Sequence, residues 1–185
     1  MKWMRNQSRW DADRLVFLDE TGMNRGMTPA FAWAPRGERA DSKVPHDPGK
    51  NVSIIGVYGL RGLVAADWKH GGFNGDDFER FVRELVLPKL QPGDTLVLDN
   101  ASIHKRKSLK NILRAAGVRL RFLPQYSPEL DPIENVWSKV KSIVRRLEPR
   151  SVKALVRAVK AGFDAVVNSD LVGWFKHAGY RVTSA

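Results

Sequence analysis

Three acidic residues stand where carboxylates could do chemistry on a phosphodiester. Asp19 ends the apolar run of RLVFLDETG, and Asp99 ends that of TLVLDNASIHK. Glu134 opens an amphipathic segment after the proline-rich stretch LPQYSPELDP. Oxygen ligands suit a hard cation such as Mg²⁺, which leaves part of its coordination shell to substrate phosphates. These three acids therefore predict a metal-dependent enzyme that acts on nucleic acid.

Two predicted strands must position the first two acids. The run Leu15–Asp19 is nearly continuous in apolar character, which is typical of a central strand, and a second strand is predicted over Leu96–Asp99. If these strands are neighbours, their carboxylates can share one cation. Two-metal phosphoryl transfer needs ions about 3.5–4 Å apart, so one carboxylate should bridge them. We expect Asp19 to be this bridge, while Asp99 and Glu134 complete one ion each.

Hydrophobic periodicity indicates the rest of the fold. Further strands are predicted over 31–34, 52–60, 63–68 and 118–122, and helices from about Asp76, from Ser102 to Gly117, at Glu134 and after Ser151. The predicted order of elements is strands, then a strand–helix–strand unit, then helices. This order suggests an α/β protein with a mixed sheet flanked by helices. Residues 1–13 are expected to be an N-terminal arm or linker remnant, and residues 14–185 one domain.

The segment that bears Glu134 has the clearest helical period of the chain. Its apolar stripe consists of Ile133, Val136, Trp137, Val140, Ile143, Val144 and Leu147. At about 100° per residue, Glu134, Lys141 and Arg145 share a second stripe that faces away from the core. We therefore expect Glu134 to hold a metal ion at the tip of the helix, while Lys141 and Arg145 contact phosphates further along.

Composition supports a polyanionic partner. The 185-residue chain has a net charge of +11, and residues 101–160 hold fifteen Lys or Arg against four acids, whereas the remaining residues hold sixteen of each kind. The positive excess therefore surrounds the second and third acids, as nucleic-acid binding requires, although a merely solvated face is the alternative. Without cysteine, disulfides and zinc–thiolate sites are excluded. The chain shows no signal peptide and no apolar run of the roughly 18 residues that span a membrane.

Each acid also has a structural interpretation. A single Asp after a strand is often a turn former or helix cap. Glu134 could complete a capping box by reaching back to the backbone of Asp131, because Asp131-Pro132-Ile133-Glu134 has the required spacing. Strand alternation directs Glu20 to the face opposite Asp19, which favours a structural role for Glu20.

The residues that follow Asp99 are ambiguous in the same way. His104 could assist at the site, but a histidine that opens a helix is more often a surface residue. The adjacent run Lys105-Arg106-Lys107 is expected to contact DNA phosphates, with a solvated helix start as the alternative.

The contexts LDET, LDNASIHK and LPQYSPELDPIENVW resemble the catalytic signatures of DDE transposases, specifically the bacterial insertion-sequence branch of the mariner-related superfamily. Thirty-four residues separate Asp99 from Glu134, a spacing typical of that superfamily. The resemblance runs from about Arg14 through the AGY at 178–180. It implies a ribonuclease-H-like fold, with Asp19, Asp99 and Glu134 as a catalytic triad that binds two Mg²⁺ or Mn²⁺ ions.

The resemblance also implies an activity and its partners. Family enzymes hydrolyse DNA at transposon ends, and the freed 3′-hydroxyl attacks target DNA, commonly at a TA dinucleotide. A dimer on DNA and a bacterial, nucleoid-associated cytoplasmic location are the natural expectations. Family members usually carry a helix-turn-helix domain ahead of the catalytic one, and none is expected in this chain, so a separate helix-turn-helix subunit is a possible partner. The alternatives are a ribonuclease-H-like nuclease or resolvase, and a non-catalytic DNA-binding transposase remnant.

Overall fold

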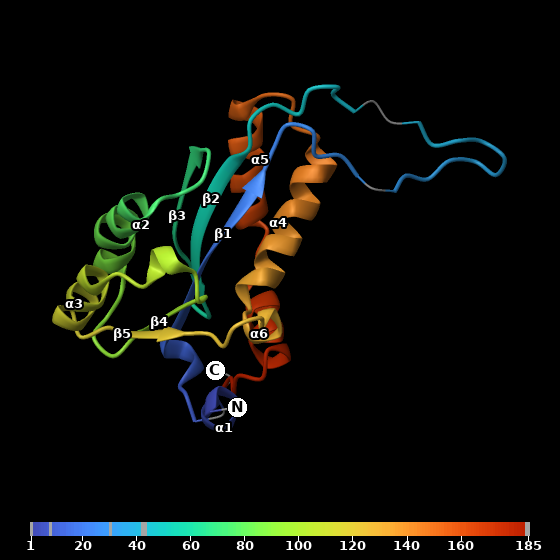
Figure 1. Cartoon of the computed structure of the whole chain (residues 1–185). Coiled ribbons are helices and arrows are strands. Elements are labelled where there is room, and N and C mark those ends of the chain that lie inside the picture. Colours follow the sequence, from blue (N-terminus) through green and yellow to red (C-terminus); the bar gives the residue numbers. More distant parts are fainter. Residues whose placement is uncertain (1, 8, 30, 42–43, 184–185) are drawn as a thin grey trace.

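The apolar run that ends in Asp19 forms the middle strand of a five-stranded sheet (Figure 1). The computed structural model describes residues 2–7, 9–29, 31–41 and 44–183. The strand order is β3-β2-β1-β4-β5. The strands are β1 (Leu15–Met23), β2 (Val52–Gly59), β3 (Gly62–His70), β4 (Thr95–Leu98) and β5 (Arg119–Phe122). The predicted mixed sheet is confirmed, and β5, which lies at its edge, alternates between exposed and half-buried residues.

Strand pairing places the first two acids side by side on neighbouring strands. β1 runs antiparallel to β2 but parallel to β4, with Leu18 opposite Leu98. Asp19 and Asp99 each follow this last pair directly. The two acids therefore come together on neighbouring strands, as the sequence predicts. Only Asp99 follows the end of its strand, however, because β1 does not end at Asp19 as expected but continues to Met23 in its pairing with β2.

Helices cover both faces of the sheet (Figure 1). One apolar cluster packs α4, α5 and α6 against the sheet, and a second packs α2 and α3 against the other face. The helices are α1 (Lys2–Gln7), α2 (Gly75–Phe81), α3 (Lys107–Ala115), α4 (Ile133–Leu147), α5 (Val152–Asp164) and α6 (Asn168–His177). Side chains of β1 alternate between the clusters, so that Phe17 faces α6 whereas Val16 and Leu18 face the other layer.

Helix α4 buries most of its predicted stripe. Ile133, Val136, Trp137, Val140 and Val144 are buried, whereas Leu147 at the helix end is 52% exposed. The helix stops where Glu148 adopts a left-handed conformation. The next helix begins as predicted, because the Ser151 hydroxyl accepts a hydrogen bond from the backbone N–H of Ala154. Glu134 is thereby fixed at the first turn of a rigid, well-packed helix.

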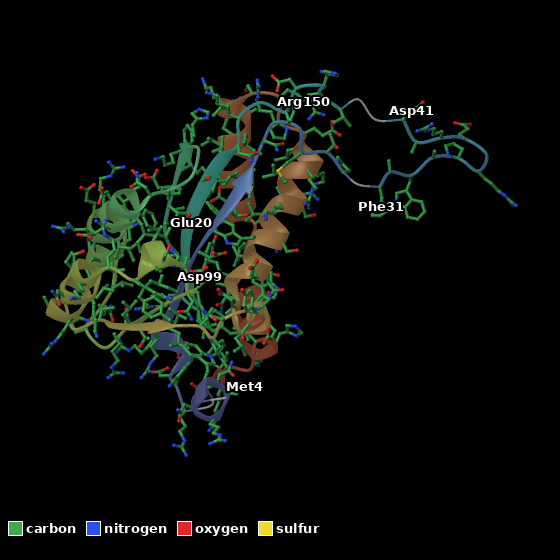
Figure 2. All side chains as sticks on the ribbon, viewed as in Figure 1. Met4, Glu20, Phe31, Asp41, Asp99 and Arg150 are labelled. Carbon is green, nitrogen blue, oxygen red and sulfur yellow. The ribbon has the colours of Figure 1, made fainter. Side chains whose placement is uncertain are left out.

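Two element predictions are wrong. The strand expected over 31–34 is absent, and Phe31 and Trp33 are 92% and 101% exposed on a long excursion between β1 and β2 (Figures 1 and 2). Its apolar alternation is only local, and a strand also needs a partner for its backbone groups. The helix expected from Ser102 to Gly117 is divided into a 3₁₀ turn, Ser102–His104, and α3. Gly117 does close it with a φ of 71°.

The segment 1–13, expected as an arm or linker remnant, contains helix α1. Residues 1 and 8 of this segment lie outside the described residues, as do 184 and 185 at the other end of the predicted domain. The Gln7 side-chain amide donates a hydrogen bond to the carbonyl of Ala178, which ties α1 to the end of α6. No helix in the described ranges is long and apolar enough to span a membrane.

Candidate active site

The three acids singled out in the sequence line one cavity of about 350 Å³. Asp19 comes from β1, Asp99 directly follows β4, and Glu134 lies in the first turn of α4. Figure 2 shows Asp99 at the point where the chain leaves β4 beside β1. Three separate elements therefore bring three carboxylates to one opening, which is the arrangement that the sequence predicts.

The carboxylate of Asp19 is held from the side by a buried tryptophan. The Trp137 indole N–H donates a hydrogen bond to Asp19 Oδ2 at 3.0 Å. Gly56 is the residue opposite Asp19 in β2, and a Cβ placed there would lie only 2.8 Å from Trp137 Cη2. Glycine at this position therefore leaves the space in which the indole reaches Asp19. The apolar stripe predicted a core position for Trp137, but nothing in it indicated this polar contact.

Burial makes Asp19 an unusual acid. Desolvation, reinforced by the negative charges of Glu134 and Asp99, raises the pKa of Asp19 to about 6, although hydrogen bonds from the Glu20 backbone and Trp137 oppose the shift. Close carboxylates repel one another, so the cavity contains negative charge that the protein does not neutralise. Such a site attracts a cation.

A fourth carboxylate, Asp131, lines the same cavity. It is 6% exposed, and Asp131 Oδ1 accepts a hydrogen bond from the backbone N–H of Ile133 at 3.2 Å. Burial and then the charge of Asp19 raise its pKa well above the usual value. The sequence offered Asp131 only as a helix cap, and that hydrogen bond is present.

The reciprocal half of the predicted capping box is not formed. The backbone N–H of Asp131 donates to the carbonyl of Pro128 at 3.0 Å, so it is already satisfied. Glu134 is exposed at the cavity instead of being folded back onto that N–H. The capping interpretation therefore does not account for Glu134.

Asp99 has a basic partner that the sequence left uncertain. His104 Nδ1 lies 2.6 Å from Asp99 Oδ1, and His104 Nε2 lies 3.8 Å from Glu20 Oε1. The ring is 3% exposed and packs against Phe78 with 4.3 Å between centroids. Burial alone would lower the pKa of His104, but the two carboxylates outweigh it and raise this pKa to about 9.

The imidazolium of His104 has the opposite effect on its partner. It holds the pKa of Asp99 below the usual range, with a further contribution from the N–H of Ala101 at 3.0 Å. Asp99 is therefore ionised and oriented, whereas neighbouring Asp19 retains a proton more readily. Glu20 lies on the far face of β1 and reaches the site only through His104, in agreement with its predicted structural role.

The donor set fits divalent cations in its chemistry. It consists of carboxylate oxygens, which Mg²⁺ and Mn²⁺ prefer, and its unneutralised charge would be relieved by a cation. Within the described ranges, no three acidic or histidine side chains stand close enough to enclose one ion together. The carboxylates thus line a shared cavity with access for substrate, and do not form a closed cage.

The basic residues predicted to contact DNA fall into two groups. Arg106 pairs with Asp76 at 2.6 Å and lies 3.7 Å from Glu79, while Lys105 and Lys107 are exposed beside it. Lys141 and Arg145 lie on α4 in line with Glu134, and within the described residues no carboxylate pairs with either. Among the residues that the structure describes, Lys105 and Lys107 form no ion pair with a carboxylate either, so Arg106 alone of these five predicted contacts is paired with acids.

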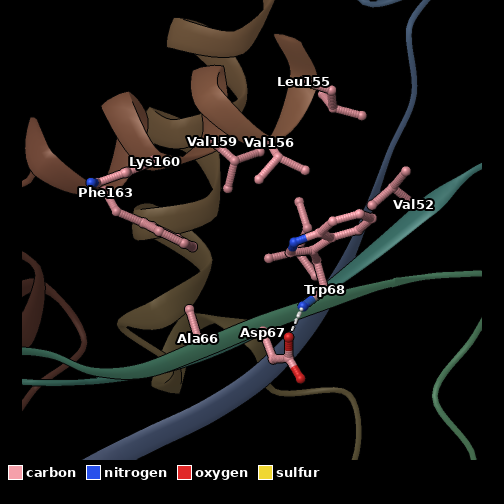
Figure 3. A pocket seen from close by; sticks show the side chains of 10 residues that line it. Val52, Ala66, Asp67, Trp68, Leu155, Val156, Val159, Lys160 and Phe163 are labelled. Atoms are coloured by element: carbon pink, nitrogen blue, oxygen red, sulfur yellow. Dashed lines mark hydrogen bonds between the residues drawn. The ribbon is translucent and has the colours of Figure 1, made fainter. Parts of the chain in front are cut away.

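A separate hollow of about 310 Å³ lies between β3 and α5 (Figure 3). Its walls are mostly apolar, with Trp68, Val159 and Phe163 among them, and none of the acids described above lines it. It lacks the convergent polar groups that chemistry on a phosphodiester requires. The acid-lined cavity is therefore the candidate active site.

A family model described as DDE superfamily endonuclease matches residues 14–156. The match includes all three acids and ends within α5. The Tc3 transposable-element transposase of Caenorhabditis elegans is 24% identical over 152 residues, which cover 78% of this chain and 46% of that protein.

Solved structures share the fold. A pre-cleavage Mos1 transpososome aligns with a TM-score of 0.73 and 15% identity over 96% of this chain and 54% of the other. The isolated catalytic domain of Mos1 mariner transposase aligns with a TM-score of 0.64 and 15% identity, over 94% and 79% of the two chains. The ribonuclease-H-like α/β fold implied by the resemblance is thus confirmed. The chain spans about half the length of the longer relatives that it matches.

Proposed function

We propose, from the premise that this chain belongs to the DDE superfamily of endonucleases, that it is the catalytic domain of a transposase. In this role it cuts DNA strands at transposon ends and joins them to target DNA. One observation carries the proposal: Asp19, Asp99 and Glu134 come from three elements and line one cavity whose negative charge is unneutralised.

Two balanced steps account for this activity. In the first, a water oxygen bonds to the scissile phosphorus, the bond from phosphorus to the 3′-oxygen breaks, and the transposon end is left with a 3′-hydroxyl. In the second, that hydroxyl attacks a phosphorus of the target, whose own 3′-oxygen departs. Two Mg²⁺ or Mn²⁺ ions, when bound, activate the attacking oxygen and stabilise the leaving one.

This chain's own residues hold and orient the ligands. Asp19, Asp99 and Glu134 would hold the metal ions through their carboxylate oxygens. The Trp137 indole fixes the direction of the Asp19 carboxylate, and His104 fixes that of Asp99. Partners that orient ligands in this way usually matter almost as much as the ligands themselves.

Joining of strands, not cutting alone, tests the proposal. The protein is incubated with Mg²⁺, a supercoiled plasmid and short duplexes that carry labelled 3′-hydroxyl ends. We expect label to become covalently attached to the plasmid. Cutting without attachment would support a simple nuclease instead, and binding without either reaction would support a non-catalytic remnant.

Further details rest on the motif resemblance and on the longer relatives. These are membership of the bacterial insertion-sequence branch, action at the nucleoid, insertion at TA, and a dimer on DNA. Recognition of the transposon ends falls to a helix-turn-helix segment or subunit outside residues 14–185. The length of the Tc3 and Mos1 relatives, about twice that of this chain, supports this division of labour.

Replacing His104 should weaken cleavage without touching a metal ligand. His104→Leu keeps a buried side chain but removes the imidazolium beside Asp99. Loss of such a partner typically costs about 10–100-fold in metal affinity or activity. We therefore expect cleavage to need more Mg²⁺ for half saturation, as measured by plasmid nicking across a Mg²⁺ series.

Two variants control this experiment. His104→Gln retains a hydrogen-bond donor and should lose less activity, and His177→Gln, at an exposed position on α6, should lose none. An unchanged Mg²⁺ requirement in a folded His104→Leu protein would refute the positioning role.

Lys141 and Arg145 of α4 should contribute to DNA affinity independently of the DNA sequence. For Lys141→Ala and Arg145→Ala, the slope of log affinity against log salt should fall by about 0.9 each if each contacts one duplex phosphate. Fluorescence anisotropy with a duplex of arbitrary sequence measures the slope. Lys139→Ala is the matched control on the same helix, because Lys139 is already paired with Asp170 at 2.5 Å. Equal slopes for all variants would exclude the contact.

A further inference from the structure

Tyr126 is strained and fully exposed at the rim of the acid-lined cavity. The loop between β5 and α4 carries it, its side chain is 99% exposed, and its φ is 55°. A left-handed backbone is unfavourable for a bulky residue, and within the described residues only Tyr126 and Glu148 adopt it without being glycine. A ring in water contributes nothing to folding that would offset the strain. Such outliers concentrate at ligand sites.

The cavity that Tyr126 lines continues into a second hollow. This neighbour has a volume of about 560 Å³, and Asn100, Leu123 and Pro124 belong to the walls of both. The two hollows are therefore neighbours on either side of these residues, and together they make up a depression beside the end of β5. The lining of its far part is mixed in character and includes Trp3, Trp10 and Arg121.

Arg121 is held in place while its charge stays available. Its guanidinium carbon lies 5.2 Å from the centroid of the Trp10 ring, a cation–π contact that orients the group. Within the part of the chain that the structure describes, no carboxylate forms an ion pair with Arg121. An oriented cation without an acidic partner suits a phosphate.

An exposed aromatic face followed by a free arginine matches the chemistry of a single polynucleotide strand. Unpaired bases stack on aromatic rings while the backbone follows positive charge. In an intact duplex, by contrast, the base faces are covered by neighbouring bases. The proposed reaction itself produces a strand end at the acids, so an unpaired nucleotide can reach this rim.

We propose that this depression binds single-stranded DNA, with one unpaired base stacked on Tyr126 next to the scissile phosphodiester and a phosphate further along the strand on Arg121. The inference rests on the proposed function, since it places the strand relative to the catalytic acids. It adds a binding site for a nucleobase that the acids do not provide.

A comparison of base and abasic tails tests the stacking contact directly. The probes are labelled duplexes with a single-stranded thymidine tail or with an abasic tail of equal length, so their charge is the same. Binding is measured by anisotropy without divalent metal. We expect the wild-type protein to prefer the thymidine tail by about 10-fold, because stacking of one base has this magnitude.

Variants assign that preference to the ring. Tyr126→Ala and Tyr126→Gly should bind both tails equally, and the glycine variant also relieves the backbone strain. Tyr126→Phe should keep the preference. Retention of the preference for the thymidine tail by Tyr126→Ala would refute the stacking site. Absence of this preference in the wild-type protein would refute it as well.

Arg121 gives an independent readout. Arg121→Gln should weaken binding of both tails alike and reduce the salt slope by about 0.7, the value for one contact to a single strand. Lys139→Ala, whose lysine is paired, should leave the slope unchanged. An unchanged slope in Arg121→Gln would overturn the phosphate contact.

The two proposals can fail separately. A protein that nicks and joins DNA but binds both tails equally lacks the stacking site and keeps its proposed function. A protein with the base preference and no metal-dependent cutting has the site but not the activity.

Discussion

Asp19→Asn, Asp99→Asn and Glu134→Gln should each lower metal-dependent DNA cleavage by at least about 1,000-fold, the scale on which removal of a central catalytic group acts. Each change keeps the shape of the side chain but removes the charge that holds a divalent ion. All three residues line one cavity, and we expect that the loss of one carboxylate is not compensated by the other two. Nicking of supercoiled plasmid with Mg²⁺ and with Mn²⁺ measures the loss.

DNA binding should respond in the opposite direction. Each substitution removes a negative charge beside the position of a phosphate, so affinity without metal should be unchanged or slightly higher. Glu129→Gln is the matched control, because Glu129 is an exposed acid just before α4 that does not line the cavity. Cleavage at the wild-type rate by any of the three variants would show that the residue is not a metal ligand.

The second large effect concerns stability. At about pH 7.5 and without metal, Asp19→Asn should raise the free energy of unfolding by on the order of 2 kcal/mol, because folding brings this carboxylate into a buried, negative site. Urea unfolding in the presence of a chelator measures the change, with Glu129→Gln again as control. A variant no more stable than the wild-type protein would contradict the unneutralised charge.

The same group contributes to the pH dependence of stability. Its pKa is about 6 in the folded protein against 3.8 for an unperturbed aspartate, so the folded state binds the proton more tightly. Between these values stability falls as pH rises, and the cost is complete above the folded pKa. Asp99, whose pKa is lowered chiefly by His104, acts the other way at more acidic pH, where its stabilisation is lost as pH falls.

Metal should remove much of this penalty. A cation that binds the folded protein stabilises it by mass action, and here it also neutralises the charge that folding concentrates. Mg²⁺ should therefore raise the midpoint of unfolding more in the wild-type protein than in Asp19→Asn. Equal stabilisation of both would place the ion elsewhere.

Sequence patterns predicted the acids because their contexts are local. Apolar runs that end in Asp19 and Asp99 indicate strands with a carboxylate at the exposed end, and the period around Glu134 indicates a helix with that residue outside the core. The same local reasoning failed over 31–34, where apolar alternation has no neighbouring strand to pair with.

Other parts of the site depend on tertiary contacts that no local pattern contains. The apolar stripe placed Trp137 in the core, but its hydrogen bond to Asp19 depends on the register that sets Gly56 opposite. Asp131 has the spacing of a helix cap, and its position in the cavity follows only from the loop before α4. The conformation of Tyr126 likewise belongs to that loop, since its residue type gives no sign of a left-handed backbone.

The placement of β1 in the middle of the sheet has a consequence for the growing polypeptide. β1, β2 and β3 are consecutive and antiparallel, so they can pair as soon as they leave the ribosome. The parallel partner β4 and the helix that carries Glu134 are synthesised only later. An unfinished chain thus exposes Asp19 without the other two ligands. The three acids can therefore line their common cavity only after α4 has been synthesised.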